Sequence, residues 1–255
     1  MPIRPWKLLV LPVLAGLAAC ASASKYEGLD AMGVYAMGQH EMAEEDYGDA
    51  AETLDRLLLV YPTFEQAAEA SFLLASAYYL DEKYITAASQ YTMFLDRYPT
   101  HPRAGEAALG VCRSYAAMSP ISQRDQTFTD QALVVCRNVV ADYQGTSVAE
   151  EAATIANDMR AKLARKIYEN GSYYLRRDLW DSAIIYFEDV VASYPETPYA
   201  PQALLGIIRA YEAIGYEDEV ERARNRLLNQ YPESEEARSL NGDPGSAVGV
   251  TGSGD

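Results

Sequence analysis

Apolar side chains recur along this chain at intervals of three and four residues, and the whole arrangement returns at a longer period. Its clearest markers are four tyrosine–proline pairs, at 61–62, 98–99, 194–195 and 231–232. The first two pairs lie 37 residues apart, and so do the last two. A fifth copy reads Tyr143-Gln144, where the proline is lost. A fixed period of this length predicts an array of similar structural units.

Each marker follows a segment whose apolar residues would share one face of a helix. Counting back from the proline, an aromatic residue lies fifteen or sixteen positions earlier, and two large apolar residues lie four and five positions earlier. An alanine or valine lies twelve positions earlier, at Ala50, Ala87, Ala183 and Val220. These intervals predict an amphipathic helix. The proline then ends that helix, because it lacks an N–H and clashes with the preceding turn.

A second amphipathic stretch precedes each of these helices, for example at 65–80, 103–118 and 199–214. Small residues stand twelve positions before the alanine, at Gly38, Ala75 and Gly171, where they would let two helices approach closely. This combination is typical of tetratricopeptide repeats.

We therefore predict an all-α fold, a right-handed superhelical solenoid of about five tetratricopeptide-type helix pairs in a domain spanning 30–240. The pairs are expected at about 30–62, 65–99, 103–144, 148–195 and 199–232.

Three segments depart from the repeat. Residues 119–127 form an insert between the helices of the third pair, where a short turn would suffice. Residues 148–177 predict one long helix, because no helix breaker occurs before Gly171. The tail at 241–255 is rich in glycine and serine, cannot bury a core and is expected to be disordered.

The first residues resemble an export signal rather than part of the fold. Arg4 and Lys7 form a short positive segment, and residues 8–19 are uncharged and mostly apolar. This stretch suits a secretory signal and is shorter than the roughly 20 residues that span a bilayer. It ends in Leu-Ala-Ala-Cys at 17–20, which resembles the lipobox of bacterial lipoproteins.

This resemblance implies a signal peptide at 1–19, cleavage and lipid attachment at Cys20, and a lipidated linker at 20–29. The alternative is an ordinary signal peptide in which Cys20 is an incidental thiol. Residue 21 is alanine rather than aspartate, which by resemblance to a lipoprotein sorting rule favours the outer membrane. Several acyl chains would anchor the protein stably.

The charge of the chain limits its partners. The formal net charge is −16, and it becomes more negative when Arg4 and Lys7 are removed with the signal peptide. Phosphate backbones and anionic headgroups would repel such a surface. We therefore expect that the protein does not bind nucleic acid. We also expect that it attaches to the membrane through the lipid alone.

Two further cysteines, Cys112 and Cys136, would lie in an oxidising compartment after export. Cys112 takes the small-residue position of the first helix of its pair, and Cys136 lies on the opposing helix. A disulfide between them is one interpretation. The other is that each is a small buried apolar side chain.

Nothing in the sequence indicates an enzyme, a cofactor or a metal site. The two histidines, His40 and His101, have no cysteine or carboxylate partner at metal-ligand spacing. No phosphate-binding glycine loop or nucleophile motif occurs. The acidic run at 41–49 lacks the pattern of a calcium loop. We expect no catalytic, cofactor-binding or metal-binding residues.

With its lipobox, five helix pairs and insert, the chain resembles the BamD, or ComL, family of outer-membrane protein assembly factors. The resemblance rests on 17–20, 98–102, the Arg124-Asp125-Gln126 of the insert, 163–165 and 173–197. It covers the mature chain to about residue 240. Departures are the glycine-rich tail and the proline lost at Gln144.

The resemblance implies a lipid-anchored scaffold on the periplasmic face of the outer membrane. Its C-terminal half would bind the barrel subunit of the assembly machinery, and its N-terminal half would recognise unfolded β-barrel substrates. Since tyrosine is enriched at interfaces, we name as candidate partner contacts Tyr78, Tyr79, Tyr173 and Tyr174, together with Arg124 and Asp125 of the insert. A repeat lipoprotein of another envelope machine, such as pilus or secretin assembly, is the alternative.

Overall fold

The computed structural model describes residues 25–240, and within that range the chain forms eleven α-helices and no strand. The predicted signal peptide, Cys20 and the tail at 241–255 lie outside the described residues. In chain order the helices are α1 (Ala31–Ala43), α2 (Tyr47–Val60), α3 (Ala67–Leu80), α4 (Tyr84–Arg97), α5 (Ala104–Met118), α6 (Thr127–Asp142), α7 (Ser147–Leu175), α8 (Trp180–Ser193), α9 (Tyr199–Ile214), α10 (Glu217–Gln230) and α11 (Glu235–Leu240).

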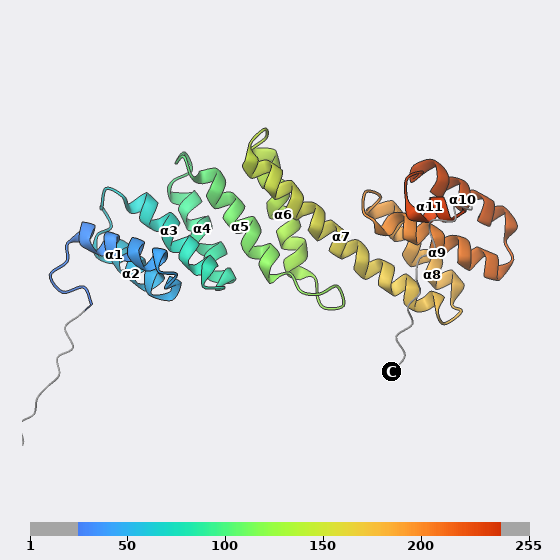
Figure 1. Cartoon of the computed structure of the whole chain (residues 1–255), viewed down its shortest axis with the longest axis horizontal. Helices are drawn as coiled ribbons and strands as arrows, with labels where there is room; N and C mark the ends of the chain where they lie inside the picture. The colour runs from blue at the N-terminus through green and yellow to red at the C-terminus, as the bar shows by residue number, and fades with distance from the viewer. Residues whose placement is uncertain (1–24, 241–255) are drawn as a thin grey trace, which may run out of the picture.

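The helices form an elongated array with α1 at one end and α11 at the other (Figure 1). Each helix packs mainly against the one before it and the one after it in the chain. The apolar interior is correspondingly a strip of four clusters that follow one another along the array. The predicted class, an all-α solenoid of helix pairs, is confirmed.

The tyrosine–proline markers end helices as the sequence predicts. Helices α2, α4, α8 and α10 each stop at the residue before the tyrosine, whose backbone N–H still donates to the carbonyl four residues back. The third pair lacks the proline, and its α6 ends at the equivalent place, before Tyr143. Gly145, with φ of 77°, supplies the left-handed turn there.

The predicted alanine positions are largely correct. Ala50, Ala87 and Ala183 are fully buried between neighbouring helices. Val220 is the exception, because it is only half-buried and Ala223, one turn later, takes the buried place in α10. The slip of the aromatic residue to Tyr216 already signals that the last repeat has a shifted register.

Close helix contacts occur where a glycine faces an aromatic ring. The Phe187 ring lies between Gly171 of α7 and Gly206 of α9, and a Cβ on these glycines would come within 2.7 Å and 2.5 Å of it. Between the second and third pairs, a Cβ on Gly110 of α5 would lie 2.6 Å from the Tyr91 ring of α4. Cys112, two residues later, instead faces Cys136. It therefore takes the close-contact position between the two helices of its pair that the sequence predicts, with a Cα–Cα distance of 4.9 Å to Cys136.

Two elements complete the array. Helix α7 is one continuous helix of 29 residues, which contacts α5, α6, α8 and α9 and joins the two halves of the solenoid (Figure 1). Helix α11 follows the fifth pair and was not predicted. It packs on α9 and α10 through the buried Ala237.

Candidate interaction surface

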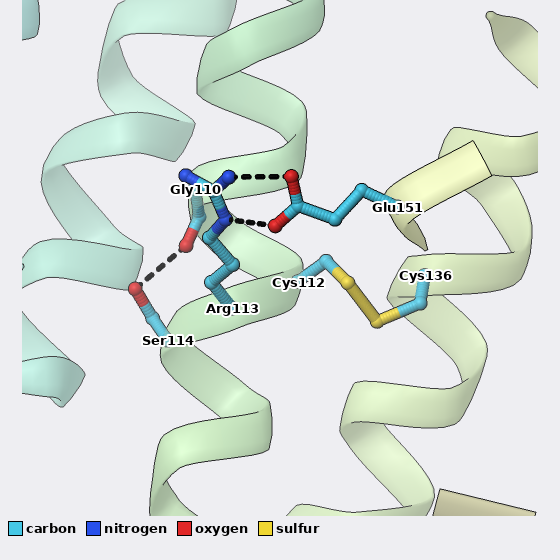
Figure 2. Close-up of a disulfide and its surroundings, with 6 residues drawn as sticks. All are labelled: Gly110, Cys112, Arg113, Ser114, Cys136 and Glu151. Atoms are coloured by element: carbon cyan, nitrogen blue, oxygen red, sulfur yellow. Dashed lines mark hydrogen bonds and ion pairs between the residues drawn. A yellow bond between two sulfur atoms is a disulfide. The ribbon is translucent and has the colours of Figure 1, made fainter. Parts of the chain in front are cut away.

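The third pair and the start of α7 are linked by covalent and ionic contacts (Figure 2). A disulfide joins Cys112 of α5 to Cys136 of α6, and both side chains are fully buried. On the adjoining face Arg113 binds Glu151 of α7 in bidentate fashion, with both N–O distances 2.6 Å. This pairing lowers the pKa of the Glu151 carboxyl. The two helices that the insert connects, α5 and α6, are therefore fixed to each other by the disulfide, and α5 is fixed to α7 by the ion pair.

The insert is held in shape by one buried glutamine. The Gln126 amide nitrogen donates to the carbonyls of Ile121 and Arg124, at 2.9 and 3.0 Å. Its amide oxygen accepts from the Thr129 hydroxyl at 2.7 Å. Because Gln126 and Thr129 are both buried, these bonds form out of reach of water and define the loop conformation.

Helix α7 binds the insert from the other side. The Lys162 ammonium donates to the hydroxyl and the carbonyl of Ser119, at 2.8 and 3.3 Å. One turn on, the Lys166 ammonium donates to the Arg124 carbonyl at 2.8 Å. Burial lowers the pKa of Lys162, an effect that Asp158 offsets only in part. Neither lysine has a carboxylate within ion-pair distance among the described residues.

The third anchor on α7 is Glu169. Its carboxylate accepts from Ser122 and Gln123 of the insert, both at 2.8 Å, and from Arg165 at 2.7 Å. Partial burial would raise the pKa of Glu169, but these hydrogen bonds outweigh it and hold the pKa below its ordinary value of 4.5. The insert is thus bound to α7 through hydrogen bonds between residues more than 40 positions apart in the sequence.

The docked insert displays its tip to solvent. Ile121 is 63% exposed, and the side chains of Gln123, Arg124 and Asp125 are also exposed. Asp125 accepts from the backbone N–H of Thr127 at 3.0 Å, so it also caps the start of α6. The two candidate residues Arg124 and Asp125 therefore lie on an accessible surface with a rigid backbone beneath it.

The tyrosine candidates fall into two separate groups. Tyr78 and Tyr79 of α3 are half-buried and pack on the apolar clusters of the first two pairs. Tyr79 also meets Tyr84 edge to face, with ring centroids 5.5 Å apart. These contacts give both residues a packing role and leave part of each ring accessible.

Tyr173 and Tyr174 lie in the last turns of α7. Tyr174 stacks on Tyr186 of α8, with centroids 5.3 Å apart, and packs on the C-terminal core. Tyr173 is 46% exposed, and the Arg177 guanidinium lies 3.7 Å from its ring centroid. Tyr173 is thus the more accessible member of the two.

A cavity of about 470 Å³ connects the insert to this end of α7. Its walls are Ser122 and Gln123 of the insert and, from α7, Lys166, Glu169, Asn170, Tyr173 and Arg176. Sequence analysis missed Lys166, Asn170 and Arg176. The run of basic residues late in α7 was the available signal, but only the docked insert turns it into one wall of a cavity.

A second cavity, of about 560 Å³, lies between α7, α9 and α11. The Phe187 ring and Leu205 contribute apolar surface, while Arg209 and the Glu235 and Glu236 of α11 contribute charge. This cavity depends on α11, the helix that the sequence did not predict.

His101 has packing and hydrogen-bond contacts, whereas His40 is exposed on α1. His101 packs edge to face on Phe94, and its Nδ1 accepts from the backbone N–H of Arg103 at 3.2 Å. Among the described residues no cluster of histidine, cysteine or carboxylate side chains could hold a metal ion. In the same part of the chain no helix is long and apolar enough to cross a membrane.

Replacing Gln126 with alanine is expected to loosen the insert while leaving the solenoid folded. The change removes hydrogen bonds to the carbonyls of three residues of the insert and to Thr129, at a cost of about 1–3 kcal/mol. Hydrogen exchange over 119–127 should become faster, whereas exchange in α3 and α4 should not change. Gln123→Ala is the matched control, because Gln123 is exposed and makes one bond to Glu169. Equal protection in the Gln126 variant and the native chain would contradict this role.

The chain matches the family model for YfiO, described as an outer membrane lipoprotein, over residues 28–227. It is 27% identical over 225 residues to the outer membrane protein assembly factor BamD of Caulobacter vibrioides, covering 86% of this chain and 74% of that one. The BamD of Rickettsia prowazekii is 24% identical over 232 residues, with 89% and 92% covered. That of Neisseria meningitidis is 23% identical over 247 residues, with 89% and 92% covered.

Two solved structures superpose on most of this chain. The TPR2AB domain of yeast Sti1 in a complex with pHSP90 superposes with a TM-score of 0.43 at 12% identity, covering 81% of this chain and 80% of that one. MamA superposes with a TM-score of 0.35 at 17% identity, covering 82% and 94%.

Proposed function

Because this chain belongs to the YfiO family of outer membrane lipoproteins, we propose that it is a lipid-anchored scaffold that helps to assemble β-barrel proteins in the outer membrane. The observation that carries the proposal is the family match over 28–227, together with relatives named as outer membrane protein assembly factors along most of the same length. The protein acts by binding other proteins, and it catalyses no reaction.

The helical array suits this role because stacked pairs create a long surface rather than a single compact pocket. Partners can bind at different places along it. The insert, α7 and the C-terminal pairs offer the accessible groups Arg124, Asp125 and Tyr173, and we assign the barrel subunit to this half. Unfolded substrate segments would bind along the N-terminal pairs, where Tyr78 and Tyr79 leave part of each ring accessible.

Attachment to the membrane is assigned to a lipid on Cys20. Between the lipid and the first helix, the end of the linker is held against the array. The Lys25 ammonium lies 2.7 Å from Glu41 of α1, and the Arg56 guanidinium of α2 lies 4.7 Å from the Tyr26 ring. The anchor would therefore hold the α1 end of the array close to the bilayer.

Affinity purification from native membranes tests the function. The full chain carries a C-terminal tag, membranes are extracted in mild detergent, and co-purifying proteins are identified by mass spectrometry. We expect a large outer-membrane β-barrel protein with repeated periplasmic domains. If a secretin co-purifies, the protein belongs to another envelope machine. If no protein co-purifies above background, the proposed role in β-barrel assembly is wrong.

The Cys20→Ser variant tests the anchor in the same cells. It should lose its lipid, be recovered in the soluble periplasmic fraction and have an unchanged helical circular dichroism spectrum. A Cys20→Ser variant that stays with membranes washed in urea, which releases chains held only by protein partners, would show that another segment provides the attachment.

A further inference from the structure

Positive charge is concentrated in one part of this acidic chain. Between Arg160 and Arg177 there are six basic residues and a single acidic one, Glu169, although the whole chain has a net charge of −16. All of these residues belong to the later part of α7 or to the turn that follows it. The insert adds Arg124, whose carbonyl is bound to Lys166. The array therefore has a basic surface near its centre and acidic surfaces on both sides.

Several of these cations have no anionic partner. Arg160 pairs with Glu196, and Arg165 pairs with Glu169. The remaining positive side chains at this place, Arg124, Lys162, Lys166, Arg176 and Arg177, take part in no ion pair within residues 25–240. This contrasts with the arginines of α10, where Arg222 and Arg226 are paired with Glu219 and Glu188.

The nearby carboxylates form an ion pair with only one of these cations, Arg165, which binds Glu169. Both oxygens of the Glu169 carboxylate are engaged, one by Arg165 and the other by Ser122 and Gln123. The Lys166 ammonium and the Arg176 guanidinium line the 470 Å³ cavity together with Glu169, and Lys166 also interacts electrostatically with Asp125, but neither cation forms an ion pair among residues 25–240. A half-buried lysine and an exposed arginine over a formed cavity favour a carboxylate from outside the chain.

The surroundings of the cavity add apolar surface. Tyr173 lines it with a ring that is 46% exposed, and Ile121 at the tip of the insert is 63% exposed. Central aromatic and apolar contacts surrounded by charged groups are characteristic of protein interfaces, in which arginine and tyrosine are enriched.

We propose that the cavity between the insert and α7 is a docking site for an acidic segment of a protein partner. An aspartate or glutamate side chain of that segment binds Lys166 and Arg176, and a neighbouring apolar residue packs on Tyr173. We choose an acidic partner because of charge complementarity. Lys166 and Arg176 attract a negatively charged segment, whereas the rest of this acidic chain repels it. The inference rests on the proposed function, because it names the chemistry by which the scaffold holds a partner.

Charge reversal tests the site in the full lipidated chain. The double variant Lys166→Glu/Arg176→Glu should recover at least about ten-fold less of the main partner from native membranes, because like charges would then face each other across the interface. The matched control is Arg97→Glu/Arg137→Glu, which makes the same change in net charge at exposed arginines on α4 and α6. The control should recover the native amount, and all three proteins should have the same helical circular dichroism spectrum.

Cross-linking identifies the partner segment. A photo-reactive amino acid at the exposed Asn170, which lines the cavity, should label a partner peptide that contains aspartate or glutamate. Changing that acidic residue to lysine should restore binding to the Lys166→Glu/Arg176→Glu variant. Labelling of a neutral or basic peptide, or failure of the lysine change to restore binding, would overturn the proposal.

A lipid surface is the other anionic candidate, and vesicles distinguish it. Vesicles of phosphatidylglycerol and phosphatidylethanolamine should bind the Cys20→Ser chain and its Lys166→Glu/Arg176→Glu derivative equally weakly. Loss of vesicle binding in the derivative, with partner recovery unchanged, would assign the site to a membrane instead.

If all lipidated variants recover the partner equally, the docking site is wrong and the scaffold function stands. If the native chain recovers no barrel protein, the scaffold function is wrong and the inference falls with it.

Discussion

Replacing Phe187 with alanine is expected to lower the free energy of unfolding by about 3–5 kcal/mol, the usual cost of removing a large ring from a packed core. The ring is 1% exposed and belongs to the C-terminal cluster. It fills the space between Gly171 and Gly206, and neither glycine has a side chain that could move into the void. The cavity would therefore persist, which places the loss near the upper end of the range.

Urea denaturation followed by circular dichroism would measure this loss. Ile185→Ala on the same helix is the matched control, since Ile185 is 69% exposed and its truncation should change the free energy by less than about 0.5 kcal/mol. Because stability in a repeat array is largely a sum of neighbouring contacts, hydrogen exchange should increase in α7–α10 and remain native in α1–α4. A loss below about 1 kcal/mol would mean that Phe187 does not support the C-terminal pairs.

Replacing both Cys112 and Cys136 with alanine is expected to cost about 3 kcal/mol, because the disulfide closes a loop with a sequence separation of 24 residues. Both side chains are fully buried, so the bond is sheltered from solvent reductants in the folded protein. The loop that it closes contains the whole insert. Loss of the bond should therefore make the third pair, and with it the base of the insert, the least stable part of the array.

Denaturation with and without reductant would measure the contribution of the disulfide. Reductant should destabilise the native chain to about the level of the double alanine variant and should leave that variant unchanged. Thiol titration of denatured protein purified under oxidising conditions provides an independent check. Two free thiols from Cys112 and Cys136 would contradict the bond, and so would an unchanged denaturation midpoint in the double variant.

Local pattern was enough to predict the helices and their ends. Apolar residues at helical spacing specify one buried face, and a proline after Tyr61 or Tyr194 ends a helix wherever the chain goes next. The alanine positions followed from the same period, and Ala50, Ala87 and Ala183 are fully buried. The unbroken run at 148–177 likewise predicted one long helix, which the structure describes as α7. These features depend on residues within a few turns of one another.

Contacts between helices could not be predicted in the same way. The sequence left open whether Cys112 and Cys136 bond or are merely buried, because either arrangement fits two facing helices. The repeat pattern predicted that Val220 would be the buried small residue of α10, but the structure buries Ala223 instead. The aromatic residue of this repeat, Tyr216, lies one position earlier than in the other repeats, and this shift changes which face of α10 is buried. It did not predict α11, whose six residues gain their stability from packing on α9 and α10 rather than from their own sequence.

The candidate site shows the same division. The sequence by itself determined that an insert interrupts the third pair and named Arg124, Asp125 and Tyr173 as candidate partner contacts. Only the tertiary structure decided that Lys166 and Glu169 hold the insert and that Lys166 and Arg176 share a cavity with Tyr173. The reason is physical. Helix formation follows short-range periodicity, whereas the meeting of residues more than 40 positions apart depends on the packing angles of the helices between them.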